Sequence, residues 1–88
     1  MSDAELRDAV EREVTEALNR FRPESNGRIA DYRVGNGRVE CWLVNEATRI
    51  PVQGQFVWIK EADLAEDSIA DTREQLDLWV QTALHLNG

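Results

Sequence analysis

Asn36-Gly37 lies between two runs of alternating apolar and polar residues, and this feature constrains the fold more than any other. Asn-Gly between such runs is typical of a two-residue β-hairpin loop, because both residues tolerate a positive φ. The loop then pairs Val34 with Val39 and Arg33 with Glu40. The opposite charges of the second pair favour this register over its neighbours. The sequence therefore predicts an antiparallel hairpin of strands Arg28–Val34 and Arg38–Asn45.

A third strand is predicted from about Val52 to Lys60, after a polar turn. Successive side chains of a strand point to opposite faces. Val52, Phe56 and Trp58 therefore share one face, and we expect them in the core. Val57 and Ile59 share the other face. The hairpin would contribute its own alternate residues to the same core, namely Ala30, Tyr32, Val34, Val39, Cys41 and Leu43.

Two helices are predicted to flank the strands. The first spans Ser2 to about Phe21, where Ser2 and Glu5 form a capping box. The second spans about Asp67 to Leu86, and a turn at Asp63-Leu64 is expected before it. Each helix carries an apolar stripe at helical spacing. The stripe of the first helix consists of Leu6, Val10, Val14, Ala17, Leu18 and Phe21. The stripe of the second helix consists of Ile69, Thr72, Leu76, Trp79, Val80, Ala83 and Leu86.

The element order is therefore α-β-β-β-α. We expect one α+β domain over residues 1–88, a three-stranded antiparallel meander with both helices packed on one face. The other face of the sheet would then be open. Its apolar residues would be Ile29, Trp42, Val44, Val57 and Ile59.

A contiguous apolar patch that contains a Trp usually marks a contact surface. The open face is therefore expected to bind protein, either a second copy of the chain or a different partner, and a homodimer is the expected state. Two alternatives remain open. A loop or the region of Leu64 could fold over the face, or one helix could cover each face.

Charge is distributed unevenly along the chain, whose formal net charge is −7. Residues 61–88 hold seven acids and a single base, Arg73. Direct nucleic-acid binding needs clustered Lys and Arg, so none is expected. Four acids of the second helix form a stripe that could meet a basic partner. An acidic inhibitor that mimics nucleic acid is thus the alternative function, through Asp67, Asp71, Glu74 and Asp77.

Candidates for chemistry are few. Cys41 is the only cysteine and is expected to be a buried apolar residue, and His85 is the only histidine, in the last turn of a helix. No nucleophile–base pair, metal set or cofactor loop can be named, so no enzyme, metal or cofactor is expected. A small-molecule pocket near Tyr32 and Trp58 is a third, weaker hypothesis.

The location of the protein is expected to be cytoplasmic. The sequence has no apolar run of about 18 residues that could span a membrane. Its first residues are acidic, whereas a secretory signal begins with basic residues and an apolar run. We therefore expect no membrane contact.

The element order resembles that of double-stranded-RNA-binding domains. Those domains begin their second helix with Lys-rich sequence, whereas this chain has Glu-Asp-Ser-Ile-Ala-Asp at residues 66–71. No RNA-binding residue is therefore carried over. The chain is also similar in size class and charge to small acidic secretion chaperones, which dimerise. The function that the sequence predicts is a small non-enzymatic protein-interaction domain.

Overall fold

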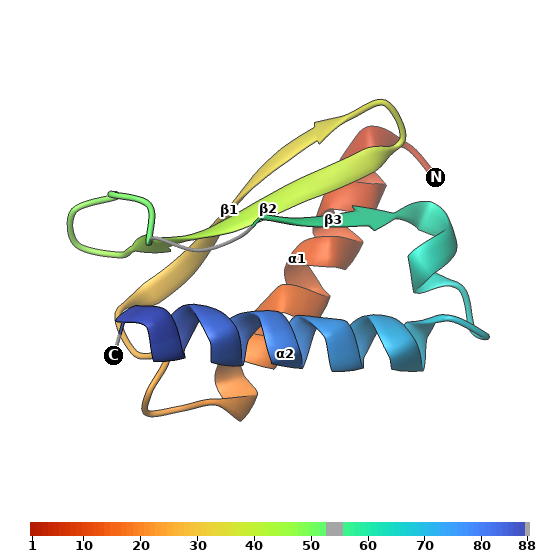
Figure 1. Ribbon diagram of the computed structural model, residues 1–88. Helices are drawn as coiled ribbons and strands as arrows, with labels where there is room; N and C mark the ends of the chain where they lie inside the picture. The colour runs from red at the N-terminus through yellow and green to blue at the C-terminus, as the bar shows by residue number, and fades with distance from the viewer. Residues whose placement is uncertain (53–55, 88) are drawn as a thin grey trace.

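The computed structural model describes residues 1–52 and 56–87, and within them it shows two α-helices and a three-stranded sheet (Figure 1). The elements are helix α1 (Asp3–Arg20), strands β1 (Arg28–Gly35), β2 (Arg38–Asn45) and β3 (Val57–Lys60), the 3-10 turn η1 (Glu61–Leu64) and helix α2 (Ile69–Asn87). The strands pair antiparallel in the order β1-β2-β3, and both helices lie on one side of the sheet. The predicted α+β fold is confirmed.

The hairpin of β1 and β2 has the predicted register. Val34 pairs with Val39, and Arg33 pairs with Glu40. Asn36 and Gly37 have φ values of 54° and 73°, as a two-residue hairpin loop of type I′ requires. Positive φ at both positions matches the twist of the loop to that of the strands. The loop therefore decides which side chains of β1 and β2 face the helices.

Helix α1 begins with the predicted capping box. The Glu5 backbone N–H donates to Ser2 Oγ, and the Ser2 backbone N–H donates to Glu5 Oε1, both at 3.1 Å. These hydrogen bonds with Ser2 lower the pKa of the Glu5 carboxyl. Ser2 and Phe21, the predicted ends of the helix, are its cap residues, and the helix itself runs from Asp3 to Arg20.

Helix α2 begins two residues later than predicted, at Ile69, so that Asp67 lies in the turn before it. The predicted turn at Asp63-Leu64 is part of η1. Most of the predicted stripe of α2 is buried, with Ile69 only partly so, and the side chain of Leu86 falls outside the described part of the structure.

The core fills the space between the sheet and the two helices. It joins residues from α1, the inner face of the sheet and α2 into one cluster: Leu6, Val10, Val14, Ala17, Leu18, Val39, Cys41, Leu43, Ile59, Leu76, Trp79, Val80 and Ala83. Two ion pairs also join the helices. Arg73 Nε donates to Glu13 Oε1 at 2.8 Å, and Arg20 Nε donates to Asp77 Oδ1 at 2.8 Å.

The predicted orientation of the third strand is wrong. In the structure Ile59 pairs with Val39 and Val57 pairs with Cys41, so both face the helices. Ile59 is 2% exposed and belongs to the core, whereas Trp58 is 48% exposed on the other face. Shifting a strand by one residue exchanges its two faces. Because both faces of this strand are apolar, alternation alone does not distinguish the two orientations.

The observed orientation of β3 has a simple physical reason. The branched side chains of Val57 and Ile59 fit between the sheet and the helices beside the small residues Val39 and Cys41. The large indole of Trp58 instead lies outside, against the side chain of Arg38. Val52, which was also expected inside, is partly buried against the core.

Candidate functional site

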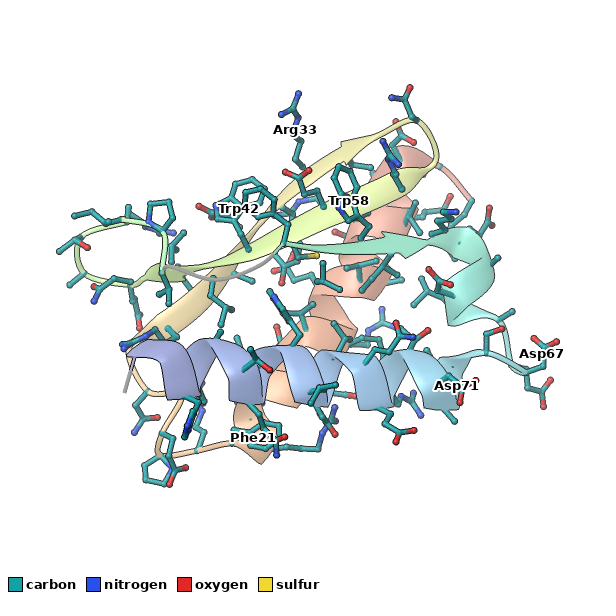
Figure 2. All side chains as sticks on the ribbon, viewed as in Figure 1. Phe21, Arg33, Trp42, Trp58, Asp67 and Asp71 are labelled. Atoms are coloured by element: carbon teal, nitrogen blue, oxygen red, sulfur yellow. The ribbon has the colours of Figure 1, made fainter. Side chains whose placement is uncertain are left out.

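The face of the sheet that points away from the helices is the candidate site, and we call it the open face. The alternation of each strand assigns its side chains from the observed pairing: Ile29, Asp31 and Arg33 from β1; Arg38, Glu40, Trp42 and Val44 from β2; and Phe56, Trp58 and Lys60 from β3 and the residue before it. Figure 2 shows Arg33, Trp42 and Trp58 on this side of the sheet. The helices leave the face uncovered (Figure 1).

Three aromatic side chains form a cluster in the open face. The ring centroids of Trp42 and Phe56 lie 6.0 Å apart with an interplanar angle of 70°, an edge-to-face contact. The Arg38 guanidinium lies 4.2 Å from the centroid of the Trp58 ring, a cation–π contact. Phe56 is 57% exposed, and Trp42 is partly buried. We call Trp42, Phe56 and Trp58 the aromatic cluster.

The structure brings together only part of the predicted interface. Ile29, Trp42 and Val44 lie on the open face, whereas Val57 and Ile59 lie on the opposite one. Sequence reasoning missed Phe56 and Trp58, whose positions depend on the orientation of β3. One signal in the sequence could have placed them there. Val57 and Ile59 are branched, and such side chains suit a tightly packed core better than two large rings do.

At one end of the open face, the chain extends the sheet at the edge of β2. The segment after β2 folds back, with the Asn45 backbone N–H donating to the Ile50 carbonyl at 2.9 Å and the Val52 N–H to the Leu43 carbonyl at 2.8 Å. Pro51 forms an isolated bridge with Val44, which is buried. These contacts place the segment beside β2 in the plane of the sheet, so the expected alternative of a loop over the face stays a prediction.

The open face is positively charged, although the chain as a whole is acidic. It carries Arg33, Arg38 and Lys60, and Arg49 reaches it from the segment after β2, with Nη1 3.9 Å from Asp31 Oδ1. Asp31 and Glu40 are its acids, which leaves a formal charge of +2 against −7 for the chain.

Several bases on the helices are instead neutralised by neighbouring acids: Arg7 pairs with Glu11, Arg20 with Asp77, and Arg73 with Glu13. Among the described residues, neither the Arg33 guanidinium nor the Lys60 ammonium group has a carboxylate within 4.0 Å. The open face therefore presents positive charge that the fold itself does not compensate.

The predicted acidic stripe is shorter than expected. Asp67, Asp71 and Glu74 are exposed, and Figure 2 shows Asp67 and Asp71 at the start of α2, away from Arg33 and Trp42. Asp77 instead accepts hydrogen bonds from Arg20 Nε and Nη2. Asp77 thus holds the two helices together and contributes little free charge.

The two residues named for the predicted small-molecule pocket lie on opposite faces of the sheet. Tyr32 is on the inner face of the sheet, with the Arg7 guanidinium 4.9 Å from its ring centroid, whereas Trp58 is on the open face. Burial raises the pKa of the Tyr32 hydroxyl. His85 is exposed in the last turn of α2, and it lines an open groove of about 950 Å³ with Phe21 and Arg28.

Cys41 is buried in the core, and burial raises the pKa of its thiol to about 12. We expect Cys41 of the folded protein to resist a thiol reagent at pH 8 and to react fully in urea, because only the thiolate is nucleophilic. The thiol ionises less readily in the fold than in the unfolded chain. Its contribution to stability is therefore complete below the unfolded pKa and declines as the pH rises above it. Rapid labelling of the native protein, followed by mass spectrometry, would contradict this.

Within residues 1–52 and 56–87, no group of three or more His, Cys, Asp and Glu side chains is arranged to hold a metal ion. In the same part of the chain, neither helix is long and apolar enough to cross a bilayer. No protein-family model, curated protein or solved structure matches this chain. The open face therefore has to be interpreted from its own chemistry.

Proposed function

We propose that this chain is a non-catalytic protein-interaction domain that binds through its open face, and that it self-associates as a homodimer. The observation that carries the proposal is the aromatic cluster. Phe56 and Trp58, each about half exposed, lie beside Trp42 on a sheet face that no helix covers. A monomeric protein rarely exposes large aromatic side chains together, and such clusters are typical of binding surfaces.

Burial of the aromatic cluster can contribute a substantial part of the energy of binding. An aromatic side chain buries roughly 150–250 Å², and about 25 cal/mol is gained per Å² of apolar surface removed from water. Covering the exposed halves of Phe56 and Trp58 is therefore worth on the order of 5 kcal/mol. Trp and Arg are also the residues that most often dominate binding energy. The contact of Arg38 with Trp58 places both kinds on the open face.

The proposal includes no catalytic step and places the protein in the cytoplasm. A catalytic cysteine needs a lowered pKa and access to substrate, whereas Cys41 has a raised pKa and is buried. A single unpaired cysteine also suits a reducing compartment. The proposals of a non-catalytic role and of a cytoplasmic location both rest on the chemistry of Cys41. The open face supports only the proposal of binding.

The test is the mass of the protein in solution, measured by light scattering on a sizing column. We expect a dimer of twice 10.1 kDa for the wild type, and a shift toward monomer for Trp58→Ala because the largest exposed ring is lost. Thr15→Ala, which truncates an exposed side chain of α1, controls for surface changes in general and should remain dimeric. Circular dichroism establishes that each variant is folded.

A wild type that stays monomeric at every concentration would contradict self-association. Equal dimerisation of Trp58→Ala and the wild type would show that the open face is not the contact.

A further inference from the structure

Helix α2 presents a surface whose chemistry complements that of the open face. Asp71, Glu74 and Leu78 are spaced by three and four residues, which places them along one side of the helix. All three are exposed, and Leu78 is 62% exposed although it is apolar. Asp67 precedes them in the turn before the helix. We call Asp71, Glu74 and Leu78 the outer stripe.

The two surfaces match in both polarity and charge. The open face offers an aromatic cluster with Arg33, Arg38 and Lys60 around it, whereas the outer stripe offers one exposed Leu and two carboxylates. Contacts between proteins typically combine an apolar centre with charges of opposite sign around it. Leu78 would supply the apolar contact to the rings, and Asp71 and Glu74 would neutralise the bases.

The two surfaces also have similar lengths. Phe56 to Lys60 spans four residues of strand, or about 13 Å at a rise of roughly 3.3 Å. Asp71 to Leu78 spans seven residues of helix, or about 10.5 Å at a rise of 1.5 Å. The outer stripe can therefore lie along the face beside β3 without reaching the segment that pairs with Val44.

Within one molecule the two surfaces meet at the edge of β3. A groove of about 230 Å³ there is lined by Phe56 from the open face and Leu78 from the outer stripe. Two copies related by a twofold axis at this edge can place both stripes on both faces at once. Such a reciprocal contact closes on itself and gives a dimer rather than a filament.

We infer that the occupant of the open face is the outer stripe of a second copy of this chain, so that each copy of the dimer supplies the missing helical layer to the sheet of the other. The inference rests on the proposed function and identifies the surface that the face binds. Contact between two open faces is disfavoured in comparison, because each carries a charge of +2. An interaction between opposite charges should weaken as salt is added.

Charge reversal in two separate variants tests the pairing of these surfaces. The face variant carries Arg33→Glu and Lys60→Glu, and the stripe variant carries Asp71→Lys and Glu74→Lys. Alone, each variant opposes like charges across the contact, and its dimerisation should be about tenfold weaker or more. Mixed, the two variants again pair opposite charges, so the mixture should form a heterodimer. Arg12→Glu, an exposed base on α1, is the control and should dimerise as the wild type does.

The measurements are light scattering of each variant and of the mixture, at low and high salt. A heterodimer in the mixture that dissociates at high salt establishes the pairing. A stripe variant that dimerises like the wild type would overturn the inference and leave the proposed function standing, because the face would then meet something other than the stripe. A wild type that is monomeric at both salt concentrations would overturn both.

The face variant could fail to fold, since Arg33 pairs with Glu40 in the sheet. A second face variant, Arg33→Gln with Lys60→Gln, removes the positive charge of these two residues. It places no new acid beside Glu40, so it is expected to fold. Alone, this neutral variant should dimerise more weakly than the wild type, because its face no longer attracts the acids of the outer stripe. Dimerisation equal to that of the wild type would contradict the pairing by charge.

Discussion

Replacing Ile59 by alanine is expected to lower the free energy of unfolding by about 2–5 kcal/mol, the usual cost of truncating a buried Ile or Leu. Ile59 is 2% exposed and lies in the core next to Val39. A domain of this size has a total stability of about 5–15 kcal/mol at most, so the variant should be partly unfolded at moderate temperature. The measurement is equilibrium unfolding in urea, followed by circular dichroism.

The neighbouring residue is the matched control. Trp58 lies on the open face, where its recognised contact is the cation–π interaction with Arg38, worth roughly 0.5–1 kcal/mol at an exposed site. Trp58→Ala should cost less than Ile59→Ala, because about half of the Trp58 side chain is already in water in the fold. If Trp58→Ala were the more destabilising of the two, the orientation of β3 described above would be wrong, and the sequence-based assignment of its faces would be right.

Replacing Arg73 by methionine is expected to lower the midpoint of thermal unfolding by about 5 °C or more at neutral pH. Glu13 is nearly buried between the helices, and Arg73 Nε and Nη2 donate to its two oxygens at 2.8 and 3.3 Å. The hydrogen bond to Glu13, with its charge, raises the pKa of the Arg73 guanidinium. Without Arg73, a nearly buried carboxylate has lost its cation. Arg12→Met removes the same charge from an exposed site and should change the midpoint little.

Equal midpoints for Arg73→Met and Arg12→Met would contradict a stabilising role of the Arg73–Glu13 ion pair.

Much of the fold could be predicted because local chemistry specifies it. Asn36-Gly37 fixed the loop type, and the loop fixed the pairing of β1 with β2. Ser2 and Glu5 fixed the start of α1. In each case a few neighbouring residues determine the geometry, so no knowledge of distant parts of the chain is needed.

The orientation of β3 could not be obtained in this way. A longer connection separates β3 from β2, and neither face of the run Phe56 to Lys60 is polar at its centre. Only packing against both helices selects Ile59 for the core. Part of the candidate site could not be predicted for the same reason. Trp42 and Ile29 were placed correctly, but Phe56, Trp58 and the positive charge of the open face follow only from the pairing of β3 with β2.

The three tryptophans lie at different depths, which gives the chain an internal optical reporter. Trp79 is 8% exposed and belongs to the core, Trp42 is partly buried, and Trp58 is about half exposed. An indole that leaves water emits at shorter wavelength and is quenched less by a dissolved quencher. Assembly through the open face should therefore shift the emission of Trp58 toward the blue and shield it from acrylamide, whereas the emission of Trp79 stays constant. Dilution of the unlabelled protein would then follow dissociation by fluorescence alone.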